Sequence, residues 1–414
     1  MKRKSPSSTN LTRRTFNVGL GAAGLVAGTA PFNIVRAASA PLKVGVLLPR
    51  SGVQAGIGQD CWRGVEITNP ILKSLGLPEL EIMSGDTETK VDVARSRAEQ
   101  LISQGAQLLV GAFDSGQTTA IAQVAEQKGI PLVINIAASP AITEQGYKFV
   151  FRNFPTAKMI LGDAFANQLE VFKEAGAAPK TVVFMHVNDT FGTAMSGGIK
   201  HVMPHFKMPY KIVQEISYDP AARDLSVEVA KAKATGADAL LMVSRLNDAI
   251  LITRELVKQR WTPEAILSMG PGWYEDQYIK TLGKLSDGPL SFVPWYDPNK
   301  PLTKTLEAAM AKKYPGLNLN TNQVYTFEAL LIAADAYKRA GTADPKALAE
   351  AIRKTHITNN VSPGAGIMFD AKGQNDKLKD SAIQNRNGKT VTVAPKASAN
   401  AKVEWPLKPY DKRG

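Results

Sequence analysis

Cysteine is nearly absent from this chain, because Cys61 is the only one among 414 residues. A single thiol cannot form an internal disulfide, and it cannot build a thiolate metal site. Cys61 stands beside Trp62 in a predicted helix, and we expect a buried, inert thiol there. Histidine is also scarce. The one pair at helical spacing, His201 and His205, has Pro204 between its members and lacks the glutamate of a zinc-binding helix, so we expect no metal site.

Catalytic motifs are missing as well. The chain has no G-x-x-x-x-G-K-[ST] phosphate loop and no G-x-S-x-G nucleophile elbow. Gly56 and Gly58 follow a predicted strand, but no glycine holds the third position of a dinucleotide fingerprint, so no cofactor is expected. His186 and Asp189 form a possible acid–base pair, although a histidine satisfied by its neighbours is the simpler interpretation. These absences favour a binding protein over an enzyme.

Acidic residues are absent from the first forty positions, which carry six of the 50 basic residues. Without this stretch, 44 basic residues face 37 acidic ones, and the net charge falls from +13 to +7. The remaining basic side chains fall on presumed solvent faces of helices and form no stripe interleaved with aromatic residues. Nucleic-acid binding needs clustered phosphate contacts, so we expect no nucleic-acid partner.

The first forty residues have the layout of an export signal. An apolar run over Val18–Ala30 follows the basic start, and small residues at 37–40 suit signal peptidase. The run is shorter than the roughly 20 residues that span a bilayer. Thr12–Phe16 (TRRTF) resembles the twin-arginine signal. We predict a signal peptide over 1–38, cut near 37–40, and a periplasmic protein without a lipid anchor because no cysteine lies near the cut. A disordered basic N-terminus is the alternative.

Short apolar runs alternate with amphipathic stretches along the rest of the chain. Two such series, near 42–155 and 180–295, predict β–α–β units and parallel sheets in an α/β fold with two similar lobes. A helix over 59–69 is expected to stop at Pro70, and the region beyond about Val361 to be rich in turns. A ligand would bind at the carboxyl ends of the strands, between the lobes.

Two loops at successive strand ends are rich in glycine and small hydroxyl residues. Gly111–Thr118 lies between a strand and a helix, and Ser115 is a candidate cap for that helix. Asn135–Pro140 follows the next strand. Free backbone N–H groups at such a helix start suit a carboxylate. Simple capping and turn formation is the alternative for each loop, but the two together favour a binding site.

In order along the chain, these loops and their neighbours resemble the Leu/Ile/Val-binding protein family of exported binding proteins that serve ABC importers. The resemblance covers about Lys43 to Asp370 and rests on short segments that are weak alone. They are Leu42–Leu48, Ser51-Gly52, Leu109–Gly111, Ile130–Ile134, Ala137–Ser139, Gly146–Arg152, Asp189–Gly192, Gly236–Ala239, Met269–Pro271 and Gly364–Asp370.

The family fold implies two Rossmann-like lobes joined by three hinge crossings (the type I periplasmic binding fold), here near Pro155, Pro294 and Pro363. The expected domains are therefore 41–155 plus 295–362, then 156–294 plus 363–405, with a tail over 406–414.

The resemblance also implies site residues. A hydroxyl at Ser115 and groups at Ala138 and Ser139 are expected to hold the ligand carboxylate. Phe191 is expected to cover the ligand from the second lobe, where family members often have tyrosine.

Two departures from the family pattern concern the part of the ligand that lies away from its carboxylate. Members that bind α-amino acids commonly have an acid after the Gly-Pro pair, whereas here Gly272 and Trp273 follow it, and Arg245 stands at the position of an aromatic residue. Burying an ammonium without a carboxylate is costly, unless Asp114 or another nearby aspartate, Asp189 or Asp248, takes over. Arg245 is a candidate for a bidentate carboxylate bond, or a surface residue at a strand end. Together with Phe113 and Tyr274, Trp273 is a candidate to stack on an aromatic ring.

These observations lead to one principal hypothesis. The protein is expected to be a monomeric, non-catalytic carrier that closes on a small carboxylate-bearing solute and delivers it to the membrane permease of an ABC importer. The resemblance favours branched-chain or related amino acids, and the departures favour a small aromatic or other organic acid. A sensory binding protein with the same fold is a further alternative, and a periplasmic enzyme is a remote one.

Overall fold

Residues 40–413 are the part of the chain that the computed structural model describes. The predicted signal peptide over 1–38 lies outside the described residues. Within residues 40–413, no helix is both long enough and apolar enough to cross a membrane.

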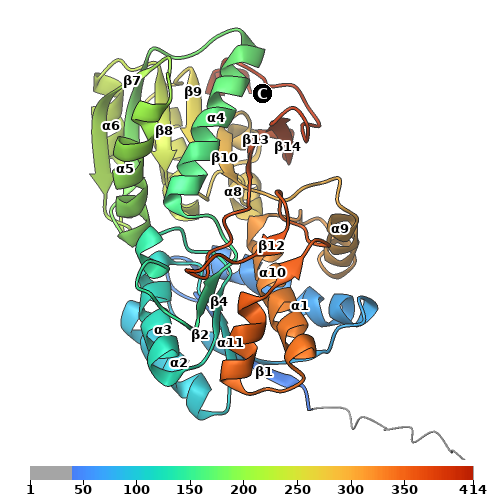
Figure 1. Ribbon diagram of the computed structural model, residues 1–414. Helices are drawn as coiled ribbons and strands as arrows, with labels where there is room; N and C mark the ends of the chain where they lie inside the picture. Colours follow the sequence, from blue (N-terminus) through green and yellow to red (C-terminus); the bar gives the residue numbers. More distant parts are fainter. Residues whose placement is uncertain (1–39, 414) are drawn as a thin grey trace, which may run out of the picture. The chain divides into compact units, whose positions relative to one another are not determined.

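The first lobe is built on a sheet of five parallel strands in the order β2-β1-β3-β4-β5. This lobe forms the lower half of the molecule in Figure 1. These strands are short apolar runs that helices cover on both faces, and such doubly covered strands favour parallel pairing. Helices α2 and α3 pack together, as do α1 and α10. The elements are β1 (Leu42–Leu48), α1 (Ala55–Ser74), β2 (Leu80–Asp86), α2 (Val91–Ser103), β3 (Leu108–Gly111), α3 (Ser115–Lys128), β4 (Leu132–Ile134), β5 (Val150–Arg152), α9 (Pro301–Lys313), α10 (Thr321–Ala340), α11 (Pro345–Arg353), β11 (His356–Ile357) and β12 (Ile367–Met368).

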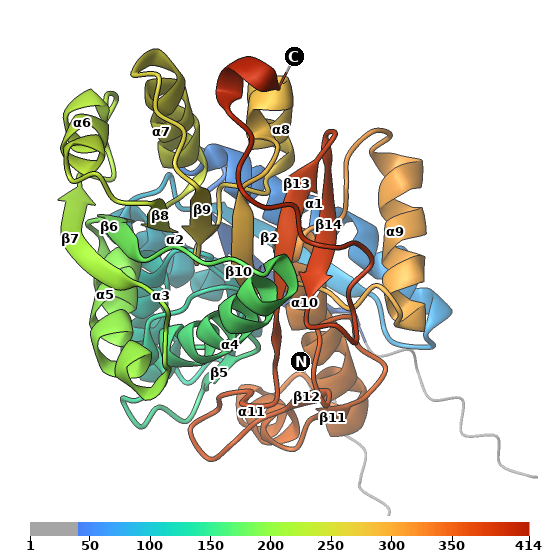
Figure 2. The same ribbon diagram turned by 90° about the horizontal axis from the view of Figure 1, so that it is seen from above.

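The second lobe contains a seven-stranded sheet in the order β14-β13-β10-β9-β8-β6-β7, parallel except where β13 meets β10 and β14. Helices α6, α7 and α8 stand along one side of this sheet, and α4 and α5 along the other (Figure 2). Both lobes thus confirm the predicted α/β fold with parallel-core sheets. The elements are α4 (Ala157–Ala175), β6 (Thr181–Val187), α5 (Thr190–Val202), β7 (Lys211–Tyr218), α6 (Ser226–Ala234), β8 (Ala239–Val243), α7 (Leu246–Lys258), β9 (Ala265–Ser268), α8 (Asp276–Leu282), β10 (Leu290–Pro294), β13 (Asp380–Arg386) and β14 (Lys389–Ala394).

The chain passes between the lobes three times, and the last crossing lies later than predicted. It does not leave the first lobe near Pro363, because Glu328 of α10 accepts hydrogen bonds from the N–H groups of Val361 and Ser362, both at 2.7 Å. The backbone N–H of Asn375 still donates to the carbonyl of Arg152 in β5. The crossing therefore lies between Asn375 and the start of β13.

Helix α1 continues through Pro70, where the sequence predicted its end. Proline has no N–H to donate to the carbonyl one turn back, which is that of Glu66. In this structure that carbonyl accepts a hydrogen bond from Lys313 Nζ at 3.3 Å. A side chain from α9 thus replaces the bond that Pro70 removes, and the helix runs on to Ser74.

The region predicted to be rich in turns contains the β13–β14 hairpin. Asn387 and Gly388 form its turn, with φ angles of 50° and 74°. Asn-Gly is the favoured pair for a two-residue hairpin turn, so the sequence itself contains a local signal for this hairpin. The tail, over its described residues 406–413, packs on the second lobe, where Leu407 N donates to the carbonyl of Glu264 at 2.8 Å.

Candidate functional site

A pocket between the two lobes is lined mostly by apolar side chains, and all sixteen lining residues are among those that the structure describes. It lies where the carboxyl ends of both sheets' strands face each other. The lining residues are Phe113, Ser115, Ile136, Ala138, Phe154, Ile160, Phe191, Arg245, Met269, Gly270, Pro271, Tyr274, Val293, Pro294, Thr321 and Asn322.

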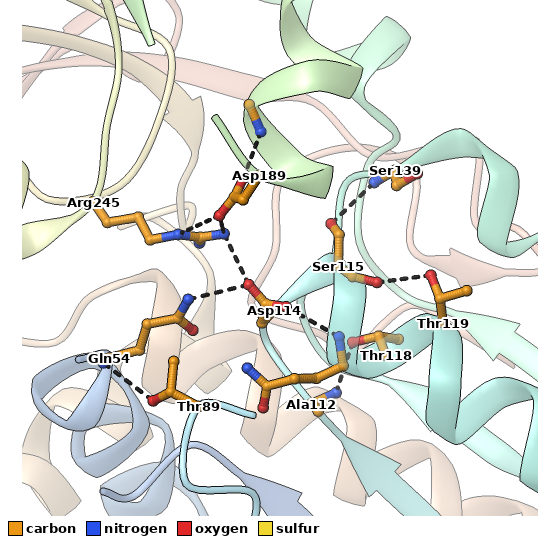
Figure 3. Close-up of polar contacts among 12 residues, drawn as sticks. Gln54, Thr89, Ala112, Asp114, Ser115, Thr118, Thr119, Ser139, Asp189 and Arg245 are labelled. Carbon is orange, nitrogen blue, oxygen red and sulfur yellow. Dashed lines mark hydrogen bonds and ion pairs between the residues drawn. The ribbon is translucent and has the colours of Figure 1, made fainter. Parts of the chain in front are cut away.

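Ser115 is the first residue of α3 rather than its cap. The cap is Asp114, whose carboxylate accepts a hydrogen bond from Gln117 N at 3.0 Å (Figure 3). The Ser115 hydroxyl is therefore not used in capping. It accepts a bond from Ser139 N at 3.3 Å, and its own proton has no acceptor among residues 40–413. A hydroxyl donor thus lies in the pocket wall at the start of a helix.

The second predicted loop meets the first at this point. Ala138 lines the pocket, and its backbone N–H donates to no acceptor in the described part of the chain. Ser139 is buried and turns its N–H to Ser115. Arg152 holds this loop, because its buried guanidinium donates to the carbonyls of Ala137 and Ser139 at 2.9 and 2.7 Å. The two loops at neighbouring strand ends therefore form one polar corner of the pocket.

Arg245 lines the pocket and is 6 % exposed, so it is not a surface residue. Its Nη2 contacts Asp114 Oδ2 of the first lobe at 2.9 Å and also Asp189 Oδ2 of the second lobe (Figure 3). Burial disfavours the charged guanidinium, but Asp189 and Asp114 outweigh that effect and raise the pKa of Arg245 above its ordinary value. The positive charge is already balanced by two carboxylates.

Two aromatic rings flank this ionic cluster. The guanidinium carbon of Arg245 lies 5.6 Å from the ring centroid of Phe113 and 5.1 Å from that of Phe191. Phe113 comes from the first lobe and has a φ of 74°, which is rare for a bulky residue, and its N–H donates to Asn135 Oδ1. Phe191 is in the first turn of α5 and is buried. Both lobes thus contribute a ring to the pocket.

The three aspartates proposed from the sequence are occupied elsewhere. Asp114 and Asp189 bind Arg245, and neither lines the pocket. Asp248 accepts hydrogen bonds from Arg245 N at 2.9 Å and from the hydroxyl of Tyr218 at 3.2 Å. Burial raises the pKa of Asp248 to about 6. None of these aspartates lines the pocket, where an ammonium group would need a carboxylate.

Gly272 and Trp273 are absent from the pocket lining. Trp273 is fully buried behind it, and its indole N–H donates to Ser244 Oγ at 2.6 Å. Gly272 has a φ of 106°, and a Cβ atom there would lie 2.4 Å from the carbonyl oxygen of Arg245. The glycine is required for the backbone to pass Arg245. The next residue, Tyr274, lines the pocket instead.

Several lining residues were not singled out from the sequence. Phe154 comes from the segment next to the first lobe crossing, and Thr321 and Asn322 come from the first turn of α10. The Asn320 cap and its partner Gln323 mark this helix start in the sequence, because a capping residue is followed three positions later by glutamine. Nothing local in the sequence indicates that this helix start reaches the pocket.

The residues considered for chemistry are held by their neighbours. His186 Nε2 lies 3.2 Å from Glu215 Oε1, and its other ring nitrogen contacts the carbonyl of Val187. Cys61 is buried, and burial raises the pKa of its thiol. No group of three or more metal-ligating side chains occurs within residues 40–413. The pocket lining, which lies wholly within the described residues, contains neither a nucleophile–base pair nor a metal cluster.

Comparison with known proteins identifies the family. The family model described as periplasmic binding protein matches residues 41–379, which is most of the chain. The chain belongs to the periplasmic binding protein family. This is a family of binding proteins and not of enzymes, in agreement with the sequence-based prediction.

The chain is similar in sequence to a named relative and in structure to two solved binding proteins. The chain is 27% identical to Leu/Ile/Val-binding protein homolog 7 of Brucella suis, over 94% of this chain and 98% of that one. A branched-chain amino acid binding protein of Streptococcus pneumoniae, solved with isoleucine, matches with a TM-score of 0.70 and 18% identity, over 88% of this chain and 100% of that one. A solute-binding protein of Rhodopseudomonas palustris, solved with benzoate, matches with a TM-score of 0.72 and 20% identity, over 89% and 99%. These structures confirm the type I periplasmic binding fold.

Proposed function

We propose that this protein is the periplasmic solute-binding component of an ABC importer and that its solute is a small carboxylic acid with an apolar, preferably aromatic, body. One observation carries the choice of solute. The pocket is lined by four aromatic residues, while no aspartate or glutamate is among its sixteen lining residues. An α-amino acid bound there would bury its ammonium without a carboxylate, at a cost of several kcal/mol.

The carboxylate is assigned to the polar corner of the pocket. The Ser115 hydroxyl and the Ala138 N–H are both free to donate there. Arg245 is a poorer partner, because Asp114 and Asp189 already surround its guanidinium and a third carboxylate would be repelled by both. Ser139 supports the site through its bond to Ser115. The aromatic lining then contacts the body of the solute, as in apolar ligand pockets generally.

A branched-chain amino acid is the second candidate. The Brucella suis relative carries the name Leu/Ile/Val-binding protein homolog, and it is aligned over nearly its full length. The protein from Streptococcus pneumoniae was solved with isoleucine, whereas the one from Rhodopseudomonas palustris was solved with benzoate. The two solute classes therefore both occur on this fold, and the pocket's lack of an acid favours the aromatic acid over the amino acid.

Delivery of the solute follows from the two-lobe arrangement. The solute stabilises the arrangement in which both lobes contact it, and this closed form docks on the membrane permease. We propose that the chain is exported through the twin-arginine pathway by residues 1–38 and acts as a monomer. A sensory role would use the same site with another membrane partner.

Isothermal titration with benzoate, leucine and isoleucine tests the choice of solute. We expect benzoate to bind more tightly than either amino acid and to raise the melting temperature with concentration, as mass action requires. Tighter binding of leucine or isoleucine would overturn the choice in favour of the second candidate. Return of unchanged benzoate after binding separates a carrier from an enzyme.

A further inference from the structure

Asn322 has an unused hydrogen-bond acceptor in the pocket wall. The residue lines the pocket and is 1 % exposed, and its Oδ1 is buried without a hydrogen-bond partner among the described residues. An unpaired amide oxygen in a buried site is destabilising. Buried acceptors are therefore satisfied by protein, water or ligand in nearly all structures. The amide oxygen of Asn322 therefore lacks a hydrogen-bond donor.

The orientation of the Asn322 amide follows from its neighbours. Its Nδ2 donates to both carboxyl oxygens of Glu275, each at 3.0 Å. Exchanging the two ends of the amide would place its oxygen against those carboxyl oxygens, so the oxygen is the end left for the pocket. Thr321, the neighbouring hydroxyl residue, donates to the carbonyl of Pro294 and has no proton to offer.

The charge around Asn322 selects the kind of donor. The pocket lining contains no acid. An ammonium at Asn322 would therefore meet no carboxylate of the lining, whereas a neutral hydroxyl needs only one acceptor.

We propose that Asn322 Oδ1 accepts a hydrogen bond from a hydroxyl group of the bound solute, so that the pocket selects hydroxylated small organic acids over unsubstituted ones. This inference rests on the proposed function and specifies the solute class of the same site. The carboxylate binds at Ser115 and Ala138, the aromatic lining contacts the body, and Asn322 recognises the hydroxyl. A site built to bind a hydroxyl rejects the analogue that lacks one, because its own polar group is then left unpaired.

Pairs of acids that differ by one hydroxyl test this proposal. We would measure the Kd of the purified protein for benzoate and for 2-, 3- and 4-hydroxybenzoate by isothermal titration. At least one hydroxybenzoate is expected to bind about tenfold more tightly than benzoate. Asn322→Ala is expected to abolish this preference. The readout is the ratio of two Kd values in one variant, so a general loss of stability does not imitate it.

Asn69→Ala is the matched control for Asn322→Ala. Asn69 lies away from the pocket and bonds Leu80 with both ends of its amide, so Asn69→Ala should lower stability and leave the preference unchanged. If the acids bind but no hydroxybenzoate is preferred, or if Asn322→Ala keeps the preference, the inference is wrong and the proposed function stands. If leucine and isoleucine bind more tightly than every acid tested, both are wrong.

Discussion

Arg245 Nη2 lies 2.9 Å from Asp114 Oδ2, and this contact joins the second lobe to the first. Asp189 on the same lobe as Arg245 completes the cluster, so one guanidinium stands between two carboxylates. The contact exists only while the lobes are together, because opening would separate Arg245 from Asp114. The closed arrangement therefore has an ionic stabilisation of its own, in addition to contacts with solute.

Replacement of Arg245 should favour the open form. Arg245→Ala leaves Asp114 and Asp189 facing each other in a buried site, and removing one partner of a buried pair costs about 3–5 kcal/mol. We expect benzoate affinity to fall by at least about tenfold, since each 1.4 kcal/mol corresponds to a factor of ten. Small-angle X-ray scattering should show a larger radius of gyration without solute. The control is Arg254→Ala, an exposed arginine of α7, the helix that directly follows Arg245, and it should change neither quantity.

Ser115→Ala tests the carboxylate corner directly. The variant removes the hydroxyl donor while leaving the Asp114 cap, so α3 should stay intact. A hydrogen bond to a charged group contributes about 1.5–3 kcal/mol, so the Kd for benzoate should rise by roughly ten- to a hundredfold. Thr119→Ala, which loses a hydroxyl one turn later, should bind normally. Equal binding by Ser115→Ala and the wild type would remove Ser115 from the site.

Asp248 should make stability depend on pH in the acidic range. Burial raises its pKa from 3.8 to about 6 in the folded state, so the folded protein holds this proton more tightly than the unfolded chain. The associated stabilisation is complete below the unfolded pKa and is lost as pH rises through about 6, by roughly 3 kcal/mol in total. Asp248→Asn removes this titration. As pH rises from 4 to 7, the melting temperature of the Asp248→Asn variant should therefore increase relative to that of the wild type.

Trp273 should support the fold without touching the solute. It is fully buried, packs on Tyr278 and donates to Ser244 Oγ. Trp273→Phe removes the indole donor and part of the packing, so we expect a loss of about 1–3 kcal/mol in unfolding free energy. Benzoate affinity should stay within about twofold, because no contact with solute is lost. A tenfold change in affinity at unchanged stability would place Trp273 at the solute.

Features that depend on residues close together in the sequence could be predicted from it. Apolar runs such as Leu42–Leu48 predicted the parallel strands, and the polar loops at Ser115 and Ala138 meet at neighbouring strand ends as expected. Contacts between residues far apart in the sequence could not be predicted from it. Arg245 and Asp114 are separated by 131 positions, and no local pattern links them. The donor to the Glu66 carbonyl that Pro70 leaves unpaired is likewise distant, because Lys313 belongs to another helix.

The late crossing between Asn375 and Asp380 also bears on the order in which the protein is assembled. Strands β6 to β10 are complete by residue 294, but β10 gains its neighbour β13 only after more than eighty further residues have been made. Until then its backbone N–H and C=O groups form an unprotected sheet edge, which can pair with another chain. A chaperone that shields nascent chains would therefore have most to protect in this protein during synthesis of residues 295–379, after the second sheet has begun and before β13 closes its edge.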